Sequence, residues 1–314
     1  MKEIGGYIEF EHYNRPMLHD NGIKLNCGRN ALAYLIKAYD IRKIAMPKFM
    51  CDSCEEILHS NNVEVDYYSI GMDFKPIIGS FDSDEWLYVV NYYGQLSKDY
   101  LLSLKEKCKL IVDNAQAYFD APIEGVPTLY TCRKFFGVAD GAILYSEKKI
   151  EVEELDESFD RMHFLMGRFE RSASEFYSEY VDNNHFFANE PIKKMSTLTE
   201  NLLRAVDYDW VSMRRIENFS YLANRLCSFN KLNIAIPNGP FMYPLYIDNG
   251  EDVRKQLQAK KIFIPTLWPA VFNLCNENDV EYDMAKNILP IPVDQRYGIE
   301  DMDYLVKEIC KCLK

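Results

Sequence analysis

The stretch Leu110–Tyr145, LIVDNAQAYFDAPIEGVPTLYTCRKFFGVADGAILY, contains three short β-like runs, and polar residues follow the first two. The run Leu110–Val112 ends in Asp113, and the run Thr128–Thr131 leads to Lys134. A carboxylate at the end of a buried strand points into the crevice beyond the sheet, where α/β proteins bind ligands. The stretch therefore predicts an α/β fold with a ligand site at this edge of its sheet.

An acid, an amide and a lysine follow one another here as Asp113, Gln116 and Lys134. That order suits the chemistry of pyridoxal phosphate (PLP), in which a buried lysine forms a Schiff base with the cofactor aldehyde. An aspartate paired with the pyridinium nitrogen keeps the ring an electron sink. The alternative interpretation is a surface lysine at Lys134 and a helix cap at Asp113, but three such residues in register favour the cofactor site.

Two motifs in the stretch, and one upstream, resemble the DegT–DnrJ–StrS family of PLP-dependent sugar aminotransferases. Val112–Gln116 is similar to the family's E-D-A-A-Q, and Lys134 followed by Asp140–Gly141 matches the spacing of its lysine motif. Upstream, Tyr93–Gln95 corresponds to the end of the family's V-H-L-Y-G-Q. The resemblance implies the fold-type-I architecture of aspartate aminotransferase.

A glycine-containing turn at Gly28, Arg29 and Asn30 opens a strongly helix-forming segment. The start of a helix offers free backbone N–H groups and the positive end of the helix dipole, which suit an anion. The resemblance implies that this turn holds the cofactor phosphate, and that Thr131 takes the place of the family's phosphate-binding serine. Because Arg29 and Asn30 replace a small hydroxyl residue of the family, the backbone contact is the expected one. An ordinary helix cap is the alternative interpretation.

Cysteines occupy two further places of interest. The family's ring-stacking aromatic falls near Cys51 of this chain, so the resemblance implies that it is missing or supplied by a neighbour such as Phe49. Cys51/Cys54 and Cys310/Cys312 have close spacings of the kind found in redox or zinc sites, but the five histidines are scattered and complete no ligand set. We expect no metal site, and we interpret Cys51 and Cys54 as buried small residues where a helix begins.

Strands and helices alternate along the chain, which predicts a mostly parallel sheet with right-handed crossovers. Period and composition predict strands at residues 43–47, 63–68, 87–90, 110–113, 128–131, 142–145, 242–247, 261–264 and 288–292. They predict helices at residues 31–38, 49–60, 100–107, 209–229, 252–260 and 299–313, and a charged helical surface insertion at residues 150–185. We expect a large PLP-binding α/β domain over residues 1–208, beginning with an irregular arm at residues 1–24. A smaller C-terminal α+β domain is expected over residues 209–314.

The composition argues against several classes of function. The chain has 314 residues, a formal net charge of -12 and a pI of about 5.0, and an acidic surface repels nucleic acid and anionic membranes. The sequence shows neither a signal-peptide pattern nor an apolar run near the roughly 18 residues of a membrane span. The chain has nine cysteines, an odd number, and shows no secretion signal, which is typical of a protein whose thiols stay reduced. We therefore expect a cytoplasmic protein.

The resemblance implies an aminotransferase that moves an amino group from a donor such as glutamate to a nucleotide-linked keto sugar. Lys134 would be its catalytic residue, with Asp113 on the ring nitrogen and Gln116 near the ring. Two alternatives stay open: another fold-type-I PLP reaction on a non-sugar ketone, and a relative that no longer catalyses. The resemblance also implies a homodimer with shared sites, and aromatic residues in the arm and at Phe186–Phe187 fit an interface.

Overall fold

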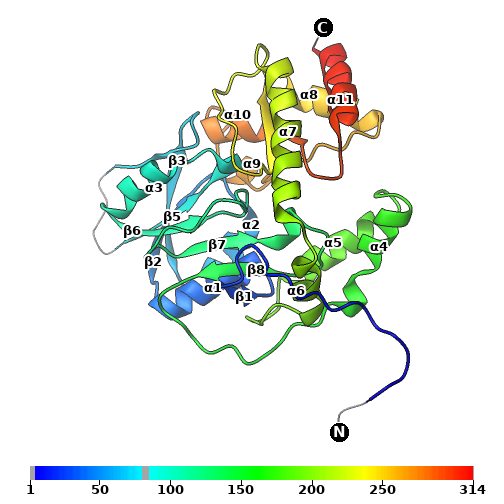
Figure 1. Cartoon of the computed structure of the whole chain (residues 1–314). Helices are drawn as coiled ribbons and strands as arrows, with labels where there is room; N and C mark the ends of the chain where they lie inside the picture. Colours follow the sequence, from blue (N-terminus) through cyan, green and yellow to red (C-terminus); the bar gives the residue numbers. More distant parts are fainter. Residues whose placement is uncertain (1–3, 80–84, 314) are drawn as a thin grey trace.

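A large sheet and a smaller C-terminal unit make up the molecule, and a long helix leads from one to the other (Figure 1). The computed structural model describes residues 4–79 and 85–313, so the first three residues of the predicted arm lie outside the described residues. Within these ranges, eight strands form the large sheet and two form a small one. The predicted α/β fold with a mostly parallel sheet is confirmed.

The central strands of the large sheet are parallel, and its edges are antiparallel. The strands are β1 (Ile23–Leu25), β2 (Lys43–Pro47), β3 (Glu64–Ile70), β4 (Pro76–Ile77), β5 (Trp86–Val90), β6 (Lys109–Asp113), β7 (Thr128–Thr131) and β8 (Ala142–Tyr145). They lie in the order β1-β8-β7-β6-β5-β2-β3-β4, and the neighbours from β7 to β3 run parallel. The strand pairs β1–β8, β7–β8 and β3–β4 are antiparallel. The carboxyl ends of the parallel strands therefore meet at one edge, where ligand sites form.

Six helices of the described residues belong to the part of the chain that carries the large sheet. They are α1 (Gly28–Tyr39), α2 (Asp52–Ser60), α3 (Lys98–Lys105), α4 (His163–Glu170), α5 (Tyr177–Phe186) and α6 (Thr197–Arg204), and 3-10 turns lie at η1 (Tyr92–Gly94), η2 (Cys132–Lys134) and η3 (Phe159–Arg161). Good helix formers fill α1, and its Leu32 and Leu35 are fully buried. In the predicted insertion at residues 150–185, the α-helices begin only at His163.

The C-terminal unit begins with the long helix α7. Its elements are α7 (Tyr208–Leu226), β9 (Met242–Tyr246), α8 (Gly250–Ala259), α9 (Val271–Leu274), α10 (Val280–Asn287), β10 (Ile288–Pro292) and α11 (Ile299–Cys312). β9 and β10 form the antiparallel two-stranded sheet. The predicted apolar stripe of α11 is buried at Met302, Leu305 and Ile309.

Two hydrophobic cores hold these parts together. The larger core surrounds the eight-stranded sheet, and the smaller one joins α7, α8 and α11 to the two-stranded sheet. Val271 of α9 and Met284 of α10 pack into the larger core. Glu281 of α10 accepts a buried hydrogen bond from the Ile70 N–H (2.8 Å), at the end of β3. The predicted domain limit between residues 208 and 209 stays a prediction, because residues of α9 and α10, which follow this limit, pack into the larger core.

Two predictions about local structure are wrong. Residues 261–264 form no strand: Lys261 has a left-handed backbone (φ 61°), and β9 and β10 pair only with each other. The alternation that suggested a strand reflects burial, because Ile262 and Ile264 pack into the smaller core. The predicted arm is not irregular to its end, since Ile23–Leu25 pairs with the edge strand β8.

No helix in residues 4–79 and 85–313 is both long enough and apolar enough to cross a membrane.

Candidate active site

Asp113 is the last residue of the central strand β6, and only 9% of it is exposed. Its Oδ1 accepts a hydrogen bond from the Ala115 N–H (2.7 Å), and its Oδ2 accepts one from the Tyr88 hydroxyl (2.8 Å). Burial raises the pKa of Asp113, and the positive charge of Lys134 opposes that rise. Because a cation stabilises the charged form of a buried carboxylate, Asp113 suits a protonated ring nitrogen.

Gln116 lies in the turn that follows β6 and is 1% exposed. Its Oε1 accepts a hydrogen bond from the Tyr93 N–H (2.8 Å), which fixes the direction of the amide. Tyr93 sits in the 3-10 turn after β5 with a left-handed backbone (φ 52°). The Gln116 Nε2 is buried and has no partner among the described residues. A buried amide donor without an acceptor is costly, so this atom is suited to an oxygen of a bound ligand.

Lys134 ends the 3-10 turn η2, which follows β7 directly. β7 is the parallel neighbour of β6, and Asp113 pairs with Leu129 in the register. The turn therefore lies at the same edge of the sheet as Asp113, and the two side chains interact electrostatically. Lys134 is exposed, and its Nζ lies 5.8 Å from the centre of the Phe241 ring. The expectation of a buried lysine is wrong for the single chain, in which Lys134 lies on the open side of the site.

The lysine motif also includes Asp140 and Gly141, and both have structural roles. Asp140 is fully buried and accepts hydrogen bonds from the Ser196 N–H and hydroxyl (2.7 Å each), just before α6. Gly141 has φ +115°, a conformation that residues with a Cβ rarely adopt. These contacts anchor the loop between Lys134 and β8 to α6.

The start of α1 lies against the end of β7. A Cβ at Gly28 would lie 2.6 Å from the Thr131 Cγ2, so glycine is needed for this approach. The Thr131 hydroxyl donates to the Ala115 carbonyl (3.4 Å). Gly28 and Thr131, two of the predicted phosphate ligands, therefore lie side by side, and Thr131 also contacts the turn that follows Asp113.

The side chains of Arg29 and Asn30 are directed to other partners. The Asn30 amide donates to the Pro191 carbonyl (2.7 Å) and is 2% exposed. An Arg29 guanidinium nitrogen lies 3.8 Å from a Glu56 carboxylate oxygen of α2. What these two residues offer an anion is their backbone at the first turn of α1, as the sequence analysis expects.

A buried thiol covers the first turn of α1. Cys27 precedes the helix, is 6% exposed, and makes no side-chain capping hydrogen bond of the usual kind. Burial raises the pKa of Cys27 to about 11, although the backbone of Asn30 and Arg29 acts in the opposite direction. The positive end of the helix therefore faces a neutral group, which leaves it able to stabilise an anion.

Arg133 is a candidate ligand that the sequence analysis did not identify. Its Nη2 donates to the Asn184 Oδ1 (2.5 Å), and its guanidinium carbon lies 4.8 Å from the centre of the Phe187 ring. Its Nη1 is buried without a partner among the described residues. Burial lowers the pKa of Arg133, and Arg29 and Cys27 are among the groups that interact with it. A guanidinium whose buried N–H has no partner among the described residues, and which lies near a helix start, is suited to an anion such as a phosphate.

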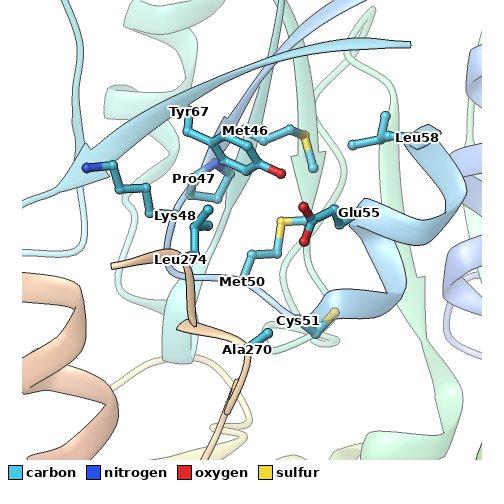
Figure 2. Close-up of a pocket in the computed structure, with 10 residues that line it drawn as sticks. All are labelled: Met46, Pro47, Lys48, Met50, Cys51, Glu55, Leu58, Tyr67, Ala270 and Leu274. Atoms are coloured by element: carbon cyan, nitrogen blue, oxygen red, sulfur yellow. The ribbon is translucent and has the colours of Figure 1, made fainter. Parts of the chain in front are cut away.

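The two residues that the sequence analysis considered for the ring-stacking position are Cys51 and Phe49. Phe49 is 1% exposed and packs edge-on against Trp268, with ring centres 4.6 Å apart, so it is a core residue. Cys51 interacts electrostatically with Asp113 and Lys134, and it also lines a small pocket between α2 and α9 (Figure 2). The interpretation of both cysteines as buried residues at a helix start holds for Cys54, which is 8% exposed, but not for the partly exposed Cys51.

In the part of the chain that the structure describes, no three His, Cys, Asp or Glu side chains converge as metal ligands.

Comparison with known proteins identifies the fold. No protein-family model and no curated protein sequence matches the chain. Solved structures match it, among them the sugar aminotransferase CalS13 from Micromonospora echinospora (TM-score 0.64, 11% identity, 93% of this chain and 88% of that chain). NtdA from Bacillus subtilis with bound cofactor PMP gives a TM-score of 0.65 at 12% identity, over 92% of this chain and 72% of that one. A DegT DnrJ EryC1 StrS aminotransferase from Brucella abortus gives 0.59 at 14% identity, over 92% and 85%.

The chain therefore has fold type I, the fold of the PLP-dependent aminotransferases that it matches. The solved structures that it matches over most of its length include the sugar aminotransferase CalS13 and a DegT DnrJ EryC1 StrS aminotransferase. The resemblance seen in the sequence motifs is confirmed at the level of the fold.

Proposed function

We propose that this protein is a PLP-dependent aminotransferase. The observation that carries the proposal is the convergence of Asp113, Gln116 and Lys134 at the carboxyl edge of the sheet, beside the start of α1. The matched structures support it, since NtdA holds PMP, the amino form of PLP.

The residues present fit the ring oxygen, the phosphate and the ring nitrogen of this cofactor. The unpartnered Gln116 Nε2 offers a hydrogen bond to the ring oxygen, and the unpartnered Arg133 Nη1 offers one to the phosphate. The first turn of α1, which meets Thr131 at Gly28, would offer backbone N–H groups to the same phosphate. Asp113 supplies the negative charge for the ring nitrogen. When bound, PLP supplies an electron sink conjugated to the carbon that exchanges the amino group.

The chain's own groups then have distinct tasks. Asp113, oriented by Tyr88 and the Ala115 N–H, would pair with the ring nitrogen and favour its protonated form. Lys134 Nζ would anchor the cofactor, and its amine would serve as the base that moves the proton at the substrate carbon. The open position of Lys134 allows donor and acceptor to reach it in turn.

The substrate and the compartment are parts of the same proposal. We take the acceptor to be a nucleotide-linked keto sugar and the donor an amino acid such as glutamate, and the sugar aminotransferase CalS13 among the matched structures supports this. All nine cysteines are free thiols, which suits the reducing cytoplasm. A non-sugar ketone as acceptor, or a chain that binds PLP without catalysis, would appear as the other outcomes of the test below.

Two half-reactions test the proposal. We expect the purified chain to gain a visible absorbance band with one equivalent of PLP, and glutamate to remove that band. A panel of nucleotide-linked keto sugars should restore it only with the true acceptor. A band that glutamate and other amino donors leave unchanged would support a non-catalytic relative, and restoration by simple ketones alone would point to a non-sugar substrate.

Arg133→Met should weaken PLP binding with little effect on pyridoxal binding. The variant loses a buried charge-assisted hydrogen bond to the phosphate, worth about 1.5–3 kcal/mol, so we expect the Kd for PLP to rise roughly 10- to 100-fold. Fluorescence titration with PLP and with pyridoxal measures both values. The matched control is Arg42→Met. Arg42 is exposed and directly precedes the first residue of β2, at the end of the strand away from the carboxyl edge. An equal loss for PLP and pyridoxal would contradict the phosphate role.

The chain should form a homodimer in solution. Large apolar side chains are exposed on and near the α4–α5 pair, including Phe159 (73%), Phe169 (93%) and Tyr177 (63%). Exposed groups of this kind mark interaction surfaces. Phe187, which the sequence analysis placed at the interface, packs locally instead and is 1% exposed. We propose that a second copy covers this face and that the two copies share their sites.

Sedimentation at micromolar concentration checks the mass. Phe169→Asp should shift the protein toward the monomer, because it places a charge in an apolar interface, while Phe229→Asp, at an exposed residue just after α7, should leave the mass unchanged. A wild-type monomer that transaminates at full rate would refute the shared-site arrangement.

A further inference from the structure

Cys51 and Cys54 form a close thiol pair at the edge of the candidate active site. Cys51 directly precedes the nine-residue helix α2, and Cys54 lies in its first turn. Their Sγ atoms are 3.8 Å apart, and neither thiol is part of a disulfide. A Cys-X-X-Cys pair at the start of a helix is the arrangement in which backbone N–H groups and the helix dipole favour a thiolate.

The two thiols differ in their access to solvent. Cys51 is partly exposed and lines the pocket between α2 and α9, where its side chain is drawn in Figure 2. Cys54 is 8% exposed and belongs to the larger hydrophobic core. A small molecule from solvent can therefore reach Cys51 directly. Cys54 meets that molecule only after it has become attached to Cys51.

The neighbouring groups also make the pKa of Cys51 lower than the pKa of Cys54. Hydrogen bonds from Cys54 and from the Ser53 hydroxyl (3.0 Å) lower the pKa of Cys51, with help from the charge of Lys134; burial and Asp113 oppose this. The bond to Cys51 and burial raise the pKa of Cys54. Other charged groups of the pocket are Lys48 and Glu55. Cys51 is thus the nucleophile of the pair and Cys54 the thiol that reacts second.

We propose that Cys51 and Cys54 form a redox-active dithiol, in which Cys51 is the site of mixed-disulfide formation with a low-molecular-weight disulfide and Cys54 resolves the adduct. This proposal does not depend on the proposed aminotransferase activity. It assigns a chemical role to a pair that PLP chemistry does not use.

The reaction is thiol–disulfide exchange in two steps. The Cys51 thiolate attacks one sulfur of the small disulfide, which forms the mixed disulfide and releases one small thiolate. Cys54 then loses its proton to solvent and attacks the Cys51 sulfur, which forms the Cys51–Cys54 bond and releases the second small thiolate. The two cysteines are oxidised, the small disulfide is reduced to two thiols, and no other oxidant is needed.

The geometry allows the second step. A disulfide needs its sulfurs about 2.05 Å apart, so they must approach by less than 2 Å from their 3.8 Å separation. Cys51 lies outside the helix with an extended backbone (φ -80°, ψ 150°), so its side chain can turn without unwinding α2. Oxidation also removes the thiolate charge that interacts with Lys134, so the redox state alters the charge beside that lysine.

The test treats the reduced full-length chain with oxidised glutathione and maps the products by mass spectrometry. The wild type should lose two of its nine free thiols as a bond between residues 51 and 54 and carry no glutathione there. Cys54→Ser should stop at one stable glutathione adduct on Cys51, whereas Cys51→Ser should leave Cys54 unmodified. The control Cys310→Ser removes one thiol of the C-terminal pair and should not change the result at residue 51.

A second measurement uses only the wild type, so it does not depend on whether the variants fold. In the wild type, the pH dependence of iodoacetamide alkylation at Cys51 should have its midpoint at least about one unit below the 8.5 of a free thiol. A wild type that keeps both thiols while the exposed Cys227 becomes glutathionylated would overturn the proposal. So would an alkylation midpoint for Cys51 at or above 8.5, since the thiolate that attacks would then be absent at neutral pH.

Discussion

Lys134→Ala should abolish measurable amino transfer while the protein stays folded. Lys134 is exposed at the end of η2, so its removal leaves no cavity, and a surface change of this kind alters the free energy of unfolding by about 0.5 kcal/mol or less. Its amine is the proposed covalent anchor and proton carrier, and general acid–base catalysis alone contributes roughly 10²- to 10⁴-fold to the rate. Single-turnover rates with PLP and glutamate, together with thermal unfolding, measure both quantities.

The matched control is Lys255→Ala, which removes an exposed lysine from α8 and breaks its ion pair with Glu251. This control should keep the wild-type rate. Transfer by Lys134→Ala at more than about a tenth of the wild-type rate would show that another lysine anchors the cofactor, since it falls outside the range expected for loss of a general base.

Asp113→Asn should keep the fold and lose most of the activity. The amide oxygen can still accept from the Ala115 N–H, and the amide nitrogen can donate to the Tyr88 oxygen, so both neighbours keep a hydrogen bond, with Tyr88 now as the acceptor. An amide cannot balance the charge of a protonated ring nitrogen. A charge-assisted hydrogen bond contributes about 1.5–3 kcal/mol, so kcat should fall roughly 10- to 100-fold.

The control for this change is Asp66→Asn, at an exposed residue of β3 that pairs with Lys43. Comparing kcat of the two variants with equal PLP loading separates catalysis from cofactor affinity. A wild-type kcat in Asp113→Asn would contradict the assignment of this carboxylate to the ring nitrogen.

The parts of the site that were predictable follow from local pattern and strand geometry. An apolar run that ends in Asp113 predicts a central strand with its acid at the carboxyl edge, and the structure confirms the strand. The short link from β7 to Lys134 then fixes the lysine beside that acid, because parallel neighbours end at the same edge.

The parts that were missed depend on contacts between distant segments. The Arg133 guanidinium contacts Asn184 and Phe187, which lie roughly fifty residues later in a segment with little sequence signal. The burial of Gln116 depends on the Tyr93 backbone, which a motif cannot reveal. The wrong strand at residues 261–264 shows the same limit, because alternating burial has the same period as a strand and does not supply a partner strand.

The position of the covalent bond between protein and cofactor tests the central claim most directly. The wild type is loaded with one equivalent of PLP, reduced with borohydride, digested and mapped by mass spectrometry. We predict that the phosphopyridoxyl mass appears on Lys134 in close to stoichiometric amount, and that Lys134→Ala carries no comparable label. A stoichiometric label on any other lysine, or only trace labels scattered over surface lysines, would contradict the assignment.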